Sequence, residues 1–361
     1  MGTSRNRRRV TSSSIEVFFA TNRSYDRDVA EPTEFGNRFH PDGAQFFRVG
    51  QAKVAAYSDD TYEVREVHTQ PEQGATDEDV DTELRGSDFL LPEIQHHAAR
   101  DRRDVLIFIH GYAGTFEESL QRAAQLKKEY LVAPNGRGAG KEPMMFLFSW
   151  PANGRMVPFL SYRSDRQDAE QSGIAMARAL MRLLDFLESQ PEPCEQRIHL
   201  VAHSMGNWAL RHAIQGMRHL LVGSRLPKVF DQVFLMAADE DEDALEHVHK
   251  LALLTQLART IHVYHSVDDR ALTISDTTKN NPDRLGAAGP RTFSGLSTRI
   301  TAVDCSRVDK TTIAHANHQY YRLRKEVIRD VRAVLSGETM LDAIPGRQVV
   351  EPGRRYRIAG A

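Results

Sequence analysis

The sequence predicts an α/β fold, in which a mostly parallel sheet is covered by helices on both faces. Six short runs are almost continuously apolar and rich in β-branched and aromatic residues, as strands buried on both faces are. Amphipathic stretches separate these runs, and such alternation is typical of parallel sheets whose crossovers are helices. The predicted strands lie in 104–111, 143–150, 197–204, 230–238, 260–266 and 298–305.

The stretches between the predicted strands carry apolar residues at helical spacing. In 163–189, Ile174, Ala177 and Leu184 belong to one stripe with a 3.6-residue period. The last amphipathic stretch ends at Gly337, a residue type that commonly follows a helix C-terminus. The predicted helices are 116–131, 163–189, 205–221 and about 318–336.

The two ends of the chain read differently from its middle. Residues 15–22 and 52–57 predict antiparallel strands at the N-terminal edge of an eight-stranded sheet. We interpret 15–336 as one domain, interrupted at 71–103 by a charged surface excursion that lacks periodicity apart from "DFLLPEI". Residues 1–14 read as a disordered basic tail, and 337–361 as an extension with a small β-hairpin around a Pro-Gly turn.

Composition excludes several classes of function. The 361 residues carry 47 Lys and Arg against 49 Asp and Glu, so neither nucleic acid nor an anionic membrane surface is an expected partner. The two cysteines form no disulfide framework, and His96-His97 and His247/His249 have no matching ligand set. We therefore expect no metal and no cofactor.

No apolar run approaches the roughly 20 residues of a membrane span, and a cytoplasmic protein is the expectation. The sequence does not indicate an oligomeric state.

The stretch Ala202-His203-Ser204-Met205-Gly206 has the features of a nucleophile elbow. An apolar strand leads into it and a helix follows. The turn is sharp, so the residues two before and two after the serine must be small, and Ala202 and Gly206 are. The alternative, a buried serine that caps the helix, is less favoured because it does not require this pattern.

A serine nucleophile needs a histidine base and an acid that orients it, in the chain order Ser, acid, His. Asp268 and Asp269 both follow the strand 260–266, where the acid is expected. Of the two we favour Asp269. The run Asp239, Asp241 and Asp243 follows the preceding strand and remains an alternative, although most of it reads as a solvated loop. For the base we favour His318, next to the last helix, over His315.

Two backbone amides are expected to bind the oxyanion of the transition state. One is the amide of Met205, directly after the serine. The other is the amide of Tyr112, in the loop after strand 104–111, where Gly111 allows a close approach to the site. Both His110 and His203 occupy positions whose backbone is needed to form the site, and we interpret their side chains as structural.

A binding pocket for the acyl group has one candidate. Residues 151–162 follow a strand at the expected site edge, and Met156, Val157, Phe159 and Leu160 would line the pocket or a short cap. The equally favoured interpretation is a loop packed on the core. Gly111, Phe159 and Leu160 are thus the candidate substrate-binding residues.

As an ordered set, several motifs resemble a bacterial family of α/β-hydrolases of the esterase/lipase superfamily, long catalogued as a domain of unknown function. The resemblance implies an α/β-hydrolase fold and a serine hydrolase, with Ser204, Asp269 and His318 at the family's nucleophile, acid and histidine positions. Ala238 stands where the family usually has proline, which affects the shape of that loop. The matching stretches are "VFFATNR" (17–23), "IFIHGYAGTFEESLQRAAQL" (107–126), "FSWPANG" (148–154), "YRSDRQDAEQSG" (162–173), "LVAHSMGN" (200–207), "LMAADEDEDAL" (235–245), "VYHSVDDRAL" (263–272) and "HQYY" (318–321).

These observations predict a serine hydrolase that cleaves a small-molecule carboxylic ester through an acyl-enzyme. An acyltransferase or an amidase would use the same residues, so the triad alone does not separate them. A non-catalytic binding protein on the same fold is the alternative from another class. The sequence does not name the substrate or its chain length.

Overall fold

The computed structural model describes most of the chain. The described residues are 10–70, 86–132, 140–152, 160–191, 195–221, 223, 225–269, 271–272, 283–308, 317–337 and 340–360. The predicted tail therefore falls largely outside them, and its last residues, from Val10, already belong to a strand.

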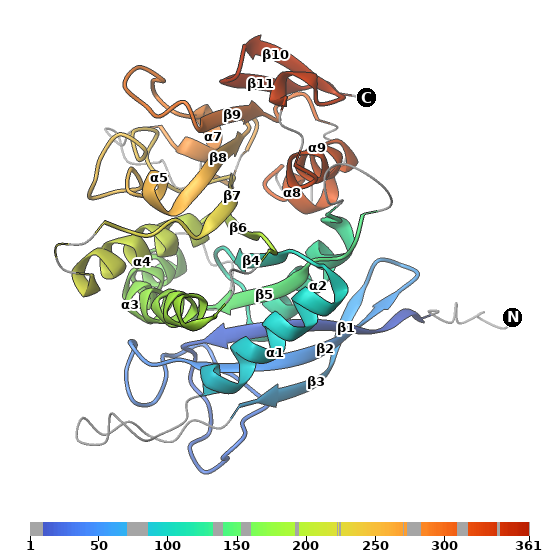
Figure 1. Ribbon diagram of the computed structural model, residues 1–361, viewed down its shortest axis with the longest axis vertical. Helices are drawn as coiled ribbons and strands as arrows, with labels where there is room; N and C mark the ends of the chain where they lie inside the picture. The colour runs from blue at the N-terminus through green and yellow to red at the C-terminus, as the bar shows by residue number, and fades with distance from the viewer. Residues whose placement is uncertain are drawn as a thin grey trace, which may run out of the picture.

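A single sheet of eleven strands runs through the described part of the molecule (Figure 1). Its strands are β1 (Val10–Thr21), β2 (Arg48–Tyr57), β3 (Tyr62–Thr69), β4 (Val105–Ile109), β5 (Met144–Ser149), β6 (Ile198–His203), β7 (Phe230–Met236), β8 (Ala258–His265), β9 (Ile300–Asp304), β10 (Arg347–Glu351) and β11 (Arg355–Ile358). Their order across the sheet is β10-β11-β9-β8-β7-β6-β4-β5-β1-β2-β3. From β11 to β1, eight neighbouring strands run parallel.

The edges of the sheet extend beyond the eight strands that the sequence predicts. At the N-terminal edge β1 and β2 pair antiparallel, as expected for 15–22 and 52–57, and β3, which the sequence did not predict, adds antiparallel to β2. On its other side β1 runs parallel to β5, so it also joins the parallel block. At the other edge β10 and β11 form a hairpin, and β11 pairs in parallel with β9. The C-terminal residues thereby continue the central sheet.

Helices cover both faces of this sheet. One face packs against α1 (Gly86–Asp101), α3 (Leu160–Ser189), α4 (Gly206–Leu220), α5 (Leu254–Leu257) and α7 (Leu285–Ala288). The other face packs against α2 (Phe116–Glu129), α8 (Tyr320–Leu323) and α9 (Lys325–Leu335), with the short 3₁₀ turn η3 (Leu341–Ala343) nearby. In β1, Phe18 belongs to the first core and Phe19 to the second, which explains the continuous apolar runs.

Helix α1 corrects the interpretation of 71–103 as an excursion without periodicity. Leu90, Ile94 and Ala98 recur every four residues and are buried against the sheet. The internal Pro92 and the polar run Gln95-His96-His97 obscured this stripe. Residues 71–85 lie outside the described part of the chain.

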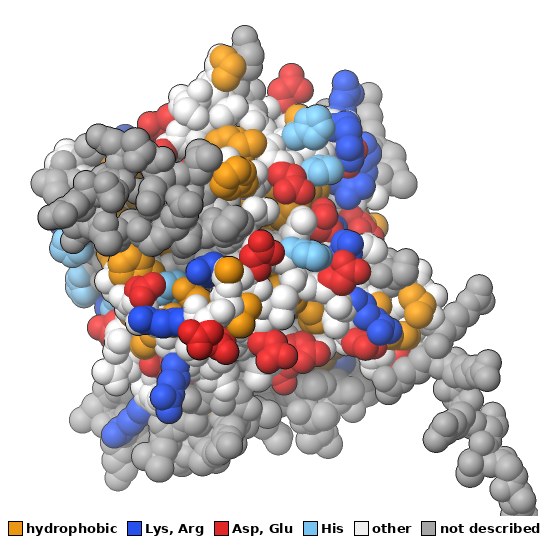
Figure 2. Space-filling view, turned by 90° about the horizontal axis from the view of Figure 1, so that it is seen from below, with side chains coloured by type: hydrophobic (Ala, Val, Ile, Leu, Met, Phe, Trp, Pro, Cys, Tyr) orange, Lys and Arg blue, Asp and Glu red, His pale blue; other side chains and the backbone are white. Residues whose placement is uncertain are grey.

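Charged side chains mark the β3 edge of the sheet. Glu63, Arg65 and Glu66 are exposed there, and Lys53 and Glu66 form an ion pair at 2.7 Å. Viewed from this side, acidic, basic and histidine side chains are interspersed over the described surface (Figure 2). Charges on an edge strand disfavour pairing with a further strand, so this edge is well suited to end the sheet.

The topology also determines where a site can form. Strand β4 lies between β5 and β6, so the loops that follow β4 and β6 lead to opposite sides of the strand order. Such a switch point opens a crevice at the carboxyl ends of parallel strands. The elbow after β6 and the His110-Gly111-Tyr112 loop after β4 both lie at this point.

Candidate active site

Ser204 occupies the turn between β6 and α4 in a strained conformation. Its φ angle is 52°, in the left-handed region that side-chain-bearing residues seldom adopt. A Cβ at Gly206 would lie 2.6 Å from the carbonyl oxygen of His110 and 2.7 Å from that of Ile109, so only glycine fits there. Asn207 braces the turn, because its Nδ2 donates to the carbonyls of Ala202 and Ser204 at 3.1 and 3.0 Å.

Gly111 brings the loop after β4 against this turn. A Cβ on Gly111 would lie 2.9 Å from Cβ of Ser204 and 3.0 Å from the carbonyl oxygen of His203. The absent side chain permits the loop to contact the serine, and the role of Gly111 in substrate binding stays a prediction. Tyr112 follows directly in this loop, and Met205 lies at the start of α4, where amides have no preceding helical carbonyl.

His318 and Asp269 lie together beside the same turn. His318 Nδ1 is 2.7 Å from Asp269 Oδ2. Asp269 is fully buried, and its other oxygen accepts from the amides of Ala271 and Leu272 at 3.1 and 3.4 Å. Asp268, the neighbour that the sequence could not exclude, is half-buried, and its amide bonds Ser266 Oγ at 3.3 Å.

Two tyrosines fix the backbone around His318. The hydroxyl of Tyr320 accepts from the amide of Ala237 and donates to the carbonyl of Tyr264, which connects α8 to the ends of β7 and β8. The ring of Tyr321 stacks on His203, with 4.3 Å between the centroids. His318 is therefore positioned by two neighbouring strands as well as by its own loop.

His203 connects the elbow to His318. Its ring centroid lies 4.7 Å from that of His318, and its Nε2 donates to the carbonyl oxygen of His318 at 3.1 Å. Burial, reinforced by His318, holds the pKa of His203 well below its usual value, so the ring is neutral at pH 7. This supports the structural role predicted for His203.

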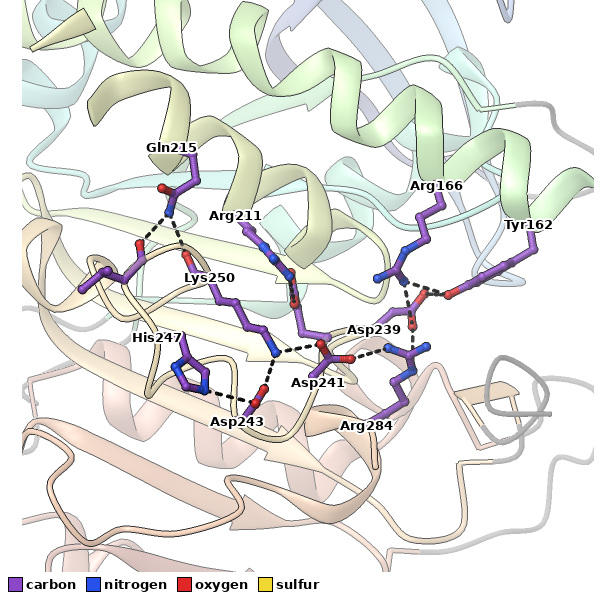
Figure 3. Close-up of polar contacts among 12 residues, drawn as sticks. Tyr162, Arg166, Arg211, Gln215, Asp239, Asp241, Asp243, His247, Lys250 and Arg284 are labelled. Atoms are coloured by element: carbon purple, nitrogen blue, oxygen red, sulfur yellow. Dashed lines mark hydrogen bonds and ion pairs between the residues drawn. The ribbon is translucent and has the colours of Figure 1, made fainter. Parts of the chain in front are cut away.

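Asp239, the alternative acid, has different partners (Figure 3). Its Oδ2 accepts from the hydroxyl of Tyr162 at 2.6 Å, and Oδ1 faces Arg166 and Arg284 at 3.8 and 3.6 Å. Its backbone amide donates to the carbonyl oxygen of Ser204 at 3.2 Å. Asp239 thus contacts the elbow through its backbone, and its carboxylate is neutralised by arginines.

The acidic run 239–243 is a buried network, which corrects its interpretation as mostly a solvated loop. Asp239 and Glu240 are 2% and 0% exposed, and Glu240 pairs with Arg211 at 3.3 Å. Lys250 reaches both Asp241 and Asp243, and Arg284 also pairs with Asp241 (Figure 3). Cations at matching positions make this burial tolerable.

Five residues that the sequence suggested cannot be placed at the site. Phe159 and His315 lie outside the described residues, as do Met156 and Val157. Leu160 begins α3, and its side chain is likewise not described. The predicted acyl pocket therefore stays a prediction.

A cavity among the described residues lies away from the proposed catalytic residues. It has a volume of about 90 Å³ and is lined by apolar side chains of α1, α3 and the strands β4 to β6, among them Ile94, Ile107 and Leu180. Ser204, Asp269 and His318 do not line it.

Sequence reasoning missed the part that α3 plays at this site. Tyr162, Asp165 and Arg166 are spaced i, i+3 and i+4, so they share one face of the helix. Tyr162 and Arg166 contact Asp239, and Asp165 Oδ2 accepts from the amide of Ala113 at 3.2 Å. Their helical spacing within "YRSDRQDAEQSG" was the signal that could have revealed them.

A parallel sheet with a strained serine after one strand, a buried aspartate after another and a histidine before the last helix defines an α/β hydrolase. The family model described as "Alpha/beta hydrolase of unknown function (DUF900)" matches residues 92–336. The chain belongs to this family. No curated protein matches the chain. None of the helices described is long and apolar enough to cross a membrane.

Proposed function

We propose that the protein is a serine hydrolase that cleaves carboxylic esters, with Ser204 as nucleophile, His318 as base and Asp269 as the acid that orients it. The observation that carries the proposal is the 2.7 Å contact between His318 Nδ1 and the buried Asp269, next to a serine held at φ 52°. A hydrogen bond at Nδ1 leaves Nε2 of His318 available to take a proton.

The reaction has two steps. His318 Nε2 accepts the Ser204 hydroxyl proton while Oγ attacks the carbonyl carbon of the ester, and the amides of Tyr112 and Met205 bind the resulting oxyanion. His318 then returns the proton to the leaving alcohol as the C–O bond breaks and an acyl-enzyme forms. Water attacks this acyl-enzyme with His318 again as base, and the acid and free Ser204 are released.

The family supports a hydrolase fold, and ester cleavage is the simplest chemistry for this arrangement. An amide or a competing acyl acceptor would pass through the same acyl-enzyme. Analysis of the products formed with and without an added alcohol separates hydrolysis from acyl transfer.

The test is a panel of p-nitrophenyl esters of increasing chain length, assayed with the wild type and Ser204→Ala. Removal of a serine nucleophile typically lowers kcat by about 10⁶-fold, so we expect no measurable turnover from the variant. Asn207→Ala serves as a control for damage to the turn, because it removes the bracing amide and keeps the hydroxyl. Equal activity of Ser204→Ala and wild type would contradict the proposal.

A further inference from the structure

Two charged side chains that the proposed reaction does not use are completely buried beside the loop after β4. Arg23 follows β1 and Asp165 lies in α3, and both have 0% exposure. Burying a charge is costly unless it is paired and hydrogen-bonded. Arg23 also bonds Ser149, Gly36 and Asn37, and both side chains contact residues 110–114, the loop that carries the proposed oxyanion donor Tyr112.

Arg23 contacts both ends of this loop. Its Nη2 donates to the carbonyl oxygen of Gly114 at 2.6 Å and lies 3.4 Å from Nε2 of His110, and its Nε donates to Ser149 Oγ at 2.8 Å. Burial lowers the pKa of Arg23 to about 9, while Asp165 and Glu118 act to raise it. The guanidinium is therefore charged at pH 7, and of these two carboxylates Asp165 has the larger effect.

The His110 side chain fixes the orientation of the peptide between Gly111 and Tyr112. The amide of Trp150 donates to His110 Nε2 at 3.1 Å, so this nitrogen carries no proton, and Nδ1 donates to the carbonyl oxygen of Gly111 at 2.8 Å. In a trans peptide the Gly111 carbonyl and the Tyr112 amide point in opposite directions. Fixing the carbonyl oxygen of Gly111 therefore fixes the direction of the Tyr112 N–H.

Asp165 holds the other side of Tyr112. Its Oδ2 accepts from the amide of Ala113 at 3.2 Å. Ala113 has φ 54°, a left-handed conformation that is unfavourable for alanine and persists only where the surroundings impose it. The contact with Asp165 is a restraint of this kind.

We propose that Asp165, charge-balanced by Arg23, is a positioning residue that holds the loop 110–114 so that the Tyr112 amide faces the oxyanion. The inference rests on the proposed function. Asp165 acts through the loop, by way of its contact with the Ala113 amide. Its contribution therefore concerns the tetrahedral state, in which the oxyanion exists, and not the bound ester.

The test compares Asp165→Ala with wild type in three measurements: kcat, KM, and the inhibition constant of an alkyl trifluoromethyl ketone, which forms a tetrahedral adduct with a serine. Loss of one oxyanion donor typically costs about 10²–10³-fold in kcat. We expect kcat to fall about 100-fold, the inhibition constant to rise by a similar factor, and KM to change less than about threefold. A purely structural role would not produce this matched change.

Asp168→Ala is the matched control. Asp168 lies in the same helix, and its carbonyl oxygen accepts from Ser172. We expect wild-type kcat and inhibition from this variant. Should Asp165→Ala not fold, Asp165→Asn keeps an oxygen for the Ala113 amide but loses the counter-charge of Arg23, and we expect about a tenfold loss of kcat.

The outcomes separate the inference from the proposed function. Wild-type kcat and inhibition in a folded Asp165 variant, or an equal loss in Asp168→Ala, would overturn the inference while leaving the function intact. A wild-type protein that neither hydrolyses esters nor binds the ketone would overturn both.

Discussion

Asp239 and Asp269 follow the neighbouring parallel strands β7 and β8, and both are buried, yet their carboxylates have different partners. Asp269 accepts from His318 and from two backbone amides. Asp239 accepts from Tyr162 and faces two arginines. Position after a strand therefore provides two candidate acids, and the partner of each carboxylate decides its role. In this account Asp269 serves the reaction and Asp239 stabilises the structure around the elbow.

The largest expected effect is on catalysis. Asp269→Asn should lower kcat by about 10³–10⁴-fold, because an amide at this position favours the wrong tautomer of His318. Asp239→Asn should lower kcat less than about tenfold, since its contact with Ser204 runs through the backbone amide. Steady-state kinetics with a short p-nitrophenyl ester measures both. The reverse order would assign the acid to Asp239.

Stability should show the opposite order. Asp239→Ala leaves Arg284, 7% exposed, with Asp241 as its remaining ion-pair partner, and it removes a partner from Arg166. Breaking a buried ion pair in this way costs about 3 kcal/mol in the free energy of unfolding. Asp269→Ala removes hydrogen bonds to His318 and to amides and should cost about 1–2 kcal/mol. Urea unfolding measures both, and a greater loss in Asp269→Ala would contradict the comparison.

The cluster around Asp239 should also make stability depend on pH. Burial raises the pKa of Glu240 from 4.5 to about 7, against the opposing effect of Arg211. Between these values the unfolded chain releases a proton that the folded protein retains, so stability falls as pH rises from 4.5 through 7. Relative to Glu240→Gln, the wild type should lose on the order of 2 kcal/mol between pH 4.5 and 8. Parallel curves for the two proteins would show that Glu240 does not titrate in this way.

Tyr162 provides a smaller test of the same cluster. Tyr162→Phe removes the hydroxyl that donates to Asp239 at 2.6 Å and should cost about 1 kcal/mol, because the ring is only partly buried. Its kcat should stay within about threefold of wild type. Thermal unfolding and ester kinetics provide the two readings, and a large loss of kcat with full stability would place Tyr162 in the reaction.

The smallest effect is expected at the residue next to the proposed acid. Asp268→Asn should lower kcat far less than Asp269→Asn does, because the carboxylate oxygen 2.7 Å from His318 Nδ1 belongs to Asp269. Kinetics run beside Asp269→Asn provide the comparison. A loss in Asp268→Asn as large as that in Asp269→Asn would remove the distinction between the two neighbours.

The sequence predicted the central features of this fold and site because they have local signals. Apolar runs identified the buried strands, and small residues around Ser204 identified the elbow. The hairpin at β10 and β11 had a turn signal, but its pairing with β9 depends on tertiary contacts that no local pattern reveals. Helix α1 was obscured by its internal Pro92 and by polar residues between the members of its buried stripe.

Side-chain partners were the least predictable part. The sequence favoured Asp269 over Asp268 and Asp239 but could exclude neither, because the choice depends on which carboxylate reaches His318 in space. Arg23 and Asp165 are separated by more than a hundred residues of chain, and both contact the loop 110–114 only once β1 and α3 have packed beside it. Charged residues in isolation read as surface residues, so their burial required the structure.

The proposed roles of Ser204 and Asp269 are tested most directly by labelling with a fluorophosphonate. Mass spectrometry follows both the residue that is labelled and the rate of labelling. We expect one label on the peptide that contains Ser204, formed at least 100-fold more slowly in Asp269→Asn and at a rate within about tenfold of wild type in Asp239→Asn. A label on another residue, or slower labelling in Asp239→Asn than in Asp269→Asn, would contradict the account.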